Sequence, residues 1–151
     1  MTTLKPGDKA PSFEAVNQKD ETIRLSDFKG KKVLLFFYPK ASTPGCTAEA
    51  CNLRDNYETF LEKGYEVIGA SADTEKKQLN FSEKHDLPYN LLADTDKKVI
   101  EAYGVWGPKK FMGREYDGIH RTSFVIDEKG LIEEVITKVK TKDHAAQILE
   151  A

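Results

Sequence analysis

The sequence predicts an α/β protein in which a central mixed β-sheet has helices on both faces and is preceded by an N-terminal hairpin. Three observations support this prediction. Two apolar runs, at 31–38 and 65–72, have the length and composition of strands buried on both faces. Each is followed by a segment of helical period, and this alternation implies parallel pairing. Two later strand-like runs, 122–127 and 131–137, are separated by a short turn and should pair antiparallel.

The composition narrows the possible partners. A chain of 151 residues fits a single domain, 1–151, and can bury a core without disulfides. Charged residues make up 32% of it but nearly cancel, to a net charge of -2, so neither nucleic acid nor a membrane surface is expected to bind. No apolar run approaches the roughly 20 residues of a membrane span, and the first residues lack the apolar centre of a secretory signal. We therefore expect a cytoplasmic protein with small-molecule or protein partners.

The first half of the chain contains the hairpin, the central strand and the first long helix. Residues 13–16 and 22–25 have the pattern of two short strands. The run 31–38 shows no polar alternation after Lys32 and should be central in the sheet. A helix should follow and end at Gly64. Its apolar residues recur at helical spacing: Ala50, Leu53, Tyr57, Phe60 and Leu61.

The second half alternates strands and helices until the final antiparallel pair. The expected elements are a strand at 65–72, a helix from an N-cap at Thr74 to about His85, a short strand at 91–94, a short helix at 97–103 closed by Gly104, a loop region at 105–118 and a final helix supported by Ala145, Ile148 and Leu149. We see no internal repeat or linker, so no domain boundary is predicted.

The segment 39–51 joins the central strand to the first helix and holds both cysteines. If Thr43 is the N-cap, Pro44 occupies the first helical position, where proline is favoured, and Cys46 lies in the first turn. The unpaired N–H groups and the dipole of a helix N-terminus favour thiolate over thiol. These features predict a reactive thiol.

The two cysteines should face different ways on this helix. Cys46 continues the apolar stripe, whereas Cys51 falls in register with charged residues such as Arg54. Five residues along a helix separate the Cα atoms by roughly 8 to 9 Å, and a disulfide tolerates about 7 Å. A bond between them would require the first turns of the helix to unwind. The alternative is that both are ordinary small core residues.

The spacing Pro39-x-x-x-Thr43-x-x-Cys46 resembles the active-site signature of the peroxiredoxins. The run 43–47, with Cys51 five residues after Cys46, is similar to the Q-type, or bacterioferritin comigratory protein, subfamily. The likeness extends over nearly the whole chain and includes 104–107 and 118–121. The resemblance implies a thioredoxin-like fold and an enzyme that reduces hydrogen peroxide and organic hydroperoxides through a thiol.

The same resemblance implies roles for five residues. Cys46 would be the peroxidatic cysteine, and Cys51 would resolve its sulfenic acid as an intramolecular disulfide. A thioredoxin-type protein would then reduce that disulfide, as in a thioredoxin-dependent peroxiredoxin of the atypical 2-Cys type. Thr43 would hydrogen-bond the peroxide, Pro39 would shield the thiolate from water, and Arg121 would stabilise the thiolate and the leaving oxygen.

Each of these residues also has a simpler interpretation. Thr43 can be only a helix cap, Pro39 only a strand terminator, and Arg121 only a surface charge. Glu49 is a weaker candidate, either a contact near Arg121 or an exposed helix carboxylate.

The remaining expectations concern cofactors and competing functions. Two cysteines and scattered histidines predict no metal site, and no cofactor is expected. An intramolecular cysteine pair removes the chemical need for a dimer, so we expect a monomer. The competing functions are a general thiol-disulfide oxidoreductase and a redox sensor.

Overall fold

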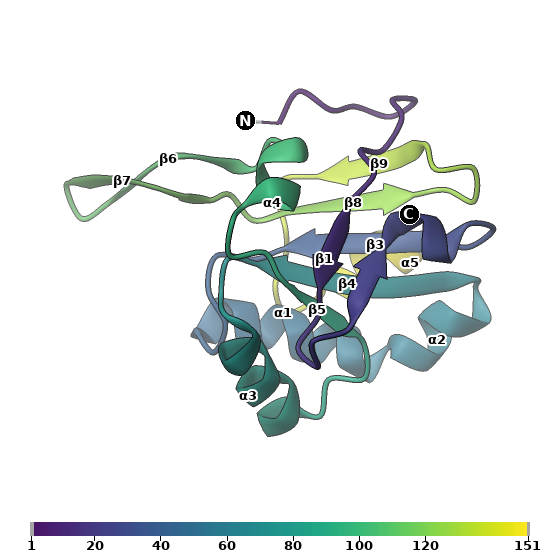
Figure 1. The fold of residues 1–151 in the computed structure, drawn as a ribbon, viewed down its shortest axis with the longest axis horizontal. Helices are drawn as coiled ribbons and strands as arrows, with labels where there is room; N and C mark the ends of the chain where they lie inside the picture. Colours follow the sequence, from purple (N-terminus) through teal and green to yellow (C-terminus); the bar gives the residue numbers. More distant parts are fainter. Residues whose placement is uncertain (1, 151) are drawn as a thin grey trace.

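The computed structural model describes residues 2–150, which form a central sheet, two small hairpins and several helices (Figure 1). The strands are β1 (Glu14–Val16), β2 (Thr22–Arg24), β3 (Lys32–Phe37), β4 (Tyr65–Ser71), β5 (Asn90–Ala93), β6 (Trp106–Phe111), β7 (Arg114–Ile119), β8 (Thr122–Ile126) and β9 (Ile132–Ile136). The helices are a 3₁₀ turn (Leu25–Phe28), α1 (Pro44–Asp55), α2 (Tyr57–Glu62), α3 (Glu75–His85), α4 (Lys98–Ala102) and α5 (His144–Leu149). No helix within residues 2–150 has both the length and the apolar character needed to cross a bilayer.

The central sheet has the strand order β5-β4-β3-β8-β9, so β3 is its middle strand. It pairs parallel with β4 and antiparallel with β8, which makes the sheet mixed. The side chains of β3 from Val33 to Phe37 are buried, as expected for a strand covered on both faces. The predicted mixed sheet and thioredoxin-like α/β fold are confirmed.

Alternate residues of β3 face two separate apolar layers. Leu34 and Phe36 pack in a cluster with residues of α1, α2, α3 and α5, whereas Leu35 and Phe37 pack with α4 and the N-terminal segment. In Figure 1, α1 and α5 lie behind the sheet, and α4 and the hairpin β1–β2 lie in front of it. Helices therefore cover both faces, and α1 and α5 lie on the same one.

The single long helix expected to end at Gly64 is interrupted at Asn56, and this part of the prediction was wrong. Asn56 departs from helical geometry, with φ -112° and ψ 10°, and separates α1 from α2. Its side-chain amide donates to the carbonyl of Asn52, which gives the local backbone an alternative to helical hydrogen bonding. On α2, Phe60 is fully buried, whereas the next residue, Leu61, is 44% exposed.

The expected loop region at 105–118 contains the antiparallel hairpin β6–β7, which is a second correction. The turn at its tip consists of Met112 and Gly113, both with positive φ, as a type I′ hairpin turn requires. The hairpin extends away from the central sheet in Figure 1, and most of its side chains are exposed. A ribbon without a buried face lacks the alternation of apolar and polar residues by which strands are recognised.

Candidate active site

The first turn of α1 presents Cys46 as predicted. Thr43 is the extended N-cap residue and Pro44 the first helical residue, so Cys46 is the third. The Thr43 hydroxyl does not cap the helix but donates to the carbonyl oxygen of Lys40, at 2.8 Å. The amides of Gly45 and Cys46 have no partner four residues back inside the helix, because they lie in its first turn. They are available to an incoming oxygen or anion.

The loop before α1 is held in place by Asp73, which follows β4. Its Oδ2 accepts a hydrogen bond from the amide of Ala41 at 2.7 Å and another from the hydroxyl of Ser71 at 2.7 Å. Within the same loop, Ser42 adopts a left-handed conformation with φ 66°, which is uncommon for a non-glycine residue. Sequence reasoning missed Asp73, although its position directly after a parallel strand that neighbours β3 is a usable signal.

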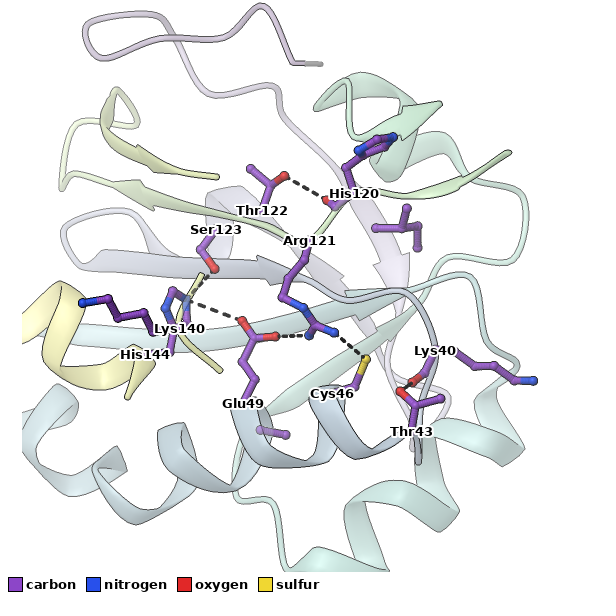
Figure 2. A network of polar contacts seen from close by, with 12 residues as sticks. Lys40, Thr43, Cys46, Glu49, His120, Arg121, Thr122, Ser123, Lys140 and His144 are labelled. Carbon is purple, nitrogen blue, oxygen red and sulfur yellow. Dashed lines mark hydrogen bonds and ion pairs between the residues drawn. The ribbon is translucent and has the colours of Figure 1, made fainter. Parts of the chain in front are cut away.

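Arg121 is the residue just before β8, and its side chain extends to α1 (Figure 2). Its Nη2 donates to Cys46 Sγ at 3.4 Å, and its Nη1 donates to Glu49 Oε1 at 2.7 Å. Burial lowers the pKa of Arg121, but the nearby charges of Cys46 and Glu49 outweigh this and raise it overall. A Cβ atom at Gly45 would lie 3.2 Å from Nη2, so glycine permits the close approach of the guanidinium.

Glu49 is fully buried on α1, so its interpretation as an exposed helix carboxylate was wrong. Burial raises the pKa of Glu49 to about 7, even though Arg121 acts in the opposite direction. Its second oxygen, Oε2, lies 3.5 Å from Nε2 of His144, the first residue of α5. Figure 2 shows the resulting row of side chains from Ser123 through His144, Glu49 and Arg121 to Cys46.

His144 had no predicted role, because nothing near it in the sequence marks it. Its side chain is fully buried, and its ring nitrogens contact Ser123 Oγ and Gln147 Oε1, each at 2.7 Å. Burial lowers the pKa of His144, and although the hydrogen bond to Gln147 acts against this, Arg121 lowers it further. Only the packing of α5 on α1 brings this histidine to the site.

Cys51 lies one and a half turns further along α1 and has different surroundings. Both cysteines are free thiols, but Cys46 is buried in the core and Cys51 is partly exposed. Around Cys51 the helix is held by a hydrogen bond from the Tyr89 hydroxyl to the Ala50 carbonyl, at 2.7 Å. The Asn52 side chain also donates to the Lys142 carbonyl, before α5, and accepts from the amide of Ala145, in the first turn of α5. Direct bonding of the two sulfurs therefore requires α1 to open, as the sequence indicated.

The model of one protein family matches residues 6–135, and its description is the AhpC/TSA family. The chain belongs to this family. It is 50% identical to peroxiredoxin Bcp of Escherichia coli strain K12 over 149 residues, covering 99% of this chain and 96% of that one. It is 48% identical to peroxiredoxin Bcp of Bacillus subtilis strain 168, covering 98% and 94%.

Solved structures give the same result. A Cys-to-Ser mutant of PrxQ from Xylella fastidiosa superposes with a TM-score of 0.93 at 26% identity, covering 99% of this chain and 96% of that one. Peroxidoxin BcpB from Mycobacterium tuberculosis gives a TM-score of 0.84 at 36% identity, covering 95% and 93%. This chain is a peroxiredoxin of the Bcp or Q type, a thiol peroxidase, as its motif indicated.

In this peroxiredoxin a hollow of about 380 Å³ lies beside the loop that carries Thr43. Its lining residues are Pro39, Lys40, Ala72, Asp73, Trp106, Lys109, Tyr116, Asp117, Gly118 and Ile119. Pro39 follows β3 and is half-buried, and the base of the β6–β7 hairpin supplies much of the opposite wall. Within residues 2–150, no group of three or more His, Cys, Asp or Glu residues is placed to hold a metal ion.

The structure thus places the predicted site residues at four positions. Cys46 and Arg121 are in contact, so Arg121 is not merely a surface charge. Thr43 lies in the turn just before Cys46, and Pro39 lines the hollow. Cys51 is set apart from them, and its role in resolution stays a prediction.

Proposed function

We propose that this peroxiredoxin reduces hydrogen peroxide and organic hydroperoxides with Cys46 as the attacking thiolate. The contact between Arg121 Nη2 and Cys46 Sγ, at 3.4 Å in the first turn of α1, carries the proposal. A guanidinium and a helix N-terminus both favour the anionic sulfur. The same groups remain in place to stabilise charge on the departing oxygen.

In the first step the Cys46 thiolate attacks one oxygen of the hydroperoxide and the O–O bond breaks. Cys46 becomes a sulfenic acid, and the departing oxide takes a proton from solvent to give an alcohol or water. The Thr43 hydroxyl donates to the Lys40 carbonyl, which leaves its own oxygen free to accept a hydrogen bond from the peroxide. Arg121 and the amides of Gly45 and Cys46 donate toward the peroxide oxygens.

In the second step the Cys51 thiol condenses with the sulfenic acid, which forms a disulfide and releases water. α1 opens to allow this, and Cys51 is only partly buried, so its own displacement uncovers little core. A thioredoxin-type dithiol then reduces the disulfide by exchange, is itself oxidised, and regenerates both thiols. This cycle is that of an atypical 2-Cys peroxiredoxin and needs no bound cofactor.

The hollow beside Pro39 is suited to the organic part of a hydroperoxide. Trp106, Tyr116 and Ile119 supply apolar surface, and Lys109 supplies a positive charge near the mouth of the site. Pro39 on its rim would restrict the access of water to the thiolate. An alkyl chain in this hollow would therefore find apolar contacts.

The proposed cycle also bears on organisation and location. Both cysteines lie on one helix, so a single copy of the domain 1–151 can complete the cycle, and we propose a monomer. A disulfide that is reduced in every cycle needs a compartment with reducing thiols, which favours the cytoplasm.

The experiment treats reduced protein with one equivalent of hydroperoxide and identifies the products by peptide mass spectrometry. We expect a disulfide between Cys46 and Cys51 in the natural protein. Cys46→Ser should consume no peroxide, and retained consumption would overturn the assignment. Cys51→Ser should react once and accumulate sulfenic and more highly oxidised Cys46.

Turnover separates the proposal from its competitors. With a thioredoxin system the natural protein should consume peroxide continuously. A redox sensor would stop after one oxidation, and a general thiol-disulfide oxidoreductase would reduce insulin disulfides without peroxide.

A further inference from the structure

A buried polar pair beside Arg121 has no role in the cycle proposed above. It consists of Glu49 on α1 and His144 on α5, and both side chains have no exposed surface. Glu49 Oε1 accepts from Arg121, but Oε2 is buried without a hydrogen-bond partner among the described residues. His144 Nε2 lies 3.5 Å from Oε2. An unpaired buried carboxylate oxygen is costly, so its partner must be identified.

The hydrogen bonds around His144 determine which ring nitrogen carries the proton. The Gln147 side chain is oriented by its amide group, which donates to the Lys138 carbonyl, and its Oε1 already accepts from the Lys140 amide. Oε1 can only accept, so His144 Nδ1 must donate to it. A neutral imidazole protonated on Nδ1 has only a lone pair at Nε2. Ser123 Oγ, 2.7 Å from Nε2, must then be the donor in that contact.

One further proton resolves the conflict between Glu49 and His144. Without it, the carboxylate oxygen Oε2 faces the lone pair of Nε2, and the two acceptors cannot bond. With one proton between them, the pair carries no net charge. On Glu49 the proton points at the Nε2 lone pair that Ser123 Oγ also contacts, and on Nε2 it can bond Oε2 while Ser123 Oγ becomes an acceptor. Burial disfavours both a charged carboxylate and a charged imidazole, which is consistent with an uncharged pair.

We propose that the Glu49–His144 pair holds one proton while Cys46 is a thiolate and releases it when Cys46 is oxidised. This inference rests on the proposed function of Cys46. In the reduced enzyme the charge of Arg121 is balanced by the thiolate, and the pair is neutral. In the oxidised enzyme the sulfur is uncharged, and the carboxylate of Glu49 balances Arg121 instead. The released proton goes to solvent, from which the departing oxide takes one, so the buried site stays neutral overall.

The groups packed around the pair support this exchange of partners. Arg121 bonds both Glu49 and the sulfur, so it is the element through which the two negative charges compete. Tyr89 faces Glu49, but its hydroxyl donates to a backbone carbonyl and its raised pKa, caused chiefly by burial, keeps it neutral. Lys109 faces Arg121 and Cys46, and Lys140 contributes its backbone amide. Glu49 and His144 are positioning residues, because they act on the sulfur only through Arg121.

The test measures the titration of the pair with and without the thiolate. Carbon-13 NMR of glutamate carboxyl groups would be recorded against pH for Cys51→Ser, which keeps Cys46, and for Cys46→Ser/Cys51→Ser, which has an uncharged group there. Glu49→Gln identifies the Glu49 signal by its loss, and the ring nitrogens of His144 report the same proton without a variant at Glu49. Glu62, an exposed carboxylate on α2, is the internal control.

We expect the Glu49 titration midpoint to lie about one pH unit lower in the protein without the thiolate, because a second negative charge near Arg121 favours the protonated pair. The Glu62 signal should not differ between the two proteins. Equal midpoints for Glu49 in the two proteins would overturn the inference. Peroxide consumption by Cys51→Ser tests the proposed function separately, so the two can fail independently.

Discussion

Cys46 and Cys51 share one helix, but the turns that carry them are stabilised by different forces. Around Cys46 the contacts are ionic and buried, with Arg121 between the sulfur and Glu49. Around Cys51 they are hydrogen bonds from Asn52 and Tyr89 that link α1 to neighbouring segments. The first kind fixes charge at one sulfur, and the second holds a helix that must later open. The four predictions below alter one end of α1 at a time.

Removing the cation at the Cys46 end should have the largest effect. Arg121→Met eliminates the donor to the sulfur and to Glu49, so we expect the rate of the first peroxide reaction to fall about 100- to 1,000-fold. Arg121→Lys keeps the charge but loses the forked geometry, so its rate should lie between those of the natural protein and Arg121→Met. Stopped-flow measurement on reduced protein gives these rates. A Met variant as fast as the natural protein would remove Arg121 from the mechanism.

Glu49 should make the stability of the reduced protein depend on pH. Its pKa rises from an ordinary value of 4.5 to about 7 on folding, so between these values the folded protein binds more protons than the unfolded chain. Stability is therefore lost as the pH rises through this range, by up to about 3 kcal/mol. The lowered pKa of His144 makes stability rise with pH instead, but His144 is present in both proteins compared below.

Glu49→Gln should abolish that loss. Urea unfolding at about pH 5 and about pH 8 would show the variant gaining relative to the natural protein as the pH rises. A difference in unfolding free energy that stays constant with pH would show that Glu49 does not bind a proton in this range.

Removing the Asn52 hydrogen bonds near Cys51 should lower the stability by less. It should increase the rate of disulfide formation. Asn52 Oδ1 accepts from the amide of Ala145 at 2.8 Å, so it caps the first turn of α5 from another helix. Asn52→Ala should lower the free energy of unfolding by about 1 to 2 kcal/mol. It should also speed disulfide formation after Cys46 is oxidised, because α1 opens with fewer contacts to break.

The matched control is Asn52→Asp, which keeps the acceptor for Ala145 and loses the donor to the Lys142 carbonyl. It should retain most of the stability. Rapid quenching followed by mass spectrometry measures the rate of disulfide formation. Unchanged rates in both variants would show that the Asn52 hydrogen bonds do not limit the opening of α1.

Tyr89→Phe should have the smallest effect. Like Asn52→Ala, it should lower the stability and speed disulfide formation. It removes one hydroxyl that donates to the Ala50 carbonyl and leaves the aromatic packing intact, so we expect a loss of about 1 kcal/mol. Thermal unfolding and the quenched disulfide assay would measure it. A variant that resolved more slowly than the natural protein would contradict the interpretation of this bond as a restraint on α1.

Local signals accounted for the parts of the fold that were predicted. β3 is an uninterrupted apolar run, and the start of α1 is marked by Thr43 and Pro44, so both could be placed from neighbouring residues alone. The β6–β7 hairpin was missed because it is exposed, although the Met112–Gly113 turn is a usable hairpin signal. Asn56 interrupts a pattern that is otherwise continuous, and its polar side chain is the only local sign of the break.

The site itself was partly predictable. Glu49 lies three residues after Cys46 and one before Ala50, so it belongs to the buried stripe of α1, and helical spacing alone could have excluded an exposed position. His144 could not be found in this way, because its contact with Glu49 depends on where α5 packs. Helical spacing relates only residues of the same helix, and His144 lies on another one.

The contact between Asn52 and the start of α5 also has a consequence for proteolysis. If α1 opens when Cys46 and Cys51 join, Ala145 loses its cap and the C-terminal segment loses an anchor on the helix. Segments that open locally are where proteases cut first. The C-terminal helix of the oxidised protein should therefore be digested sooner than that of the reduced protein, so oxidation of α1 would expose a segment almost 100 residues further along the chain.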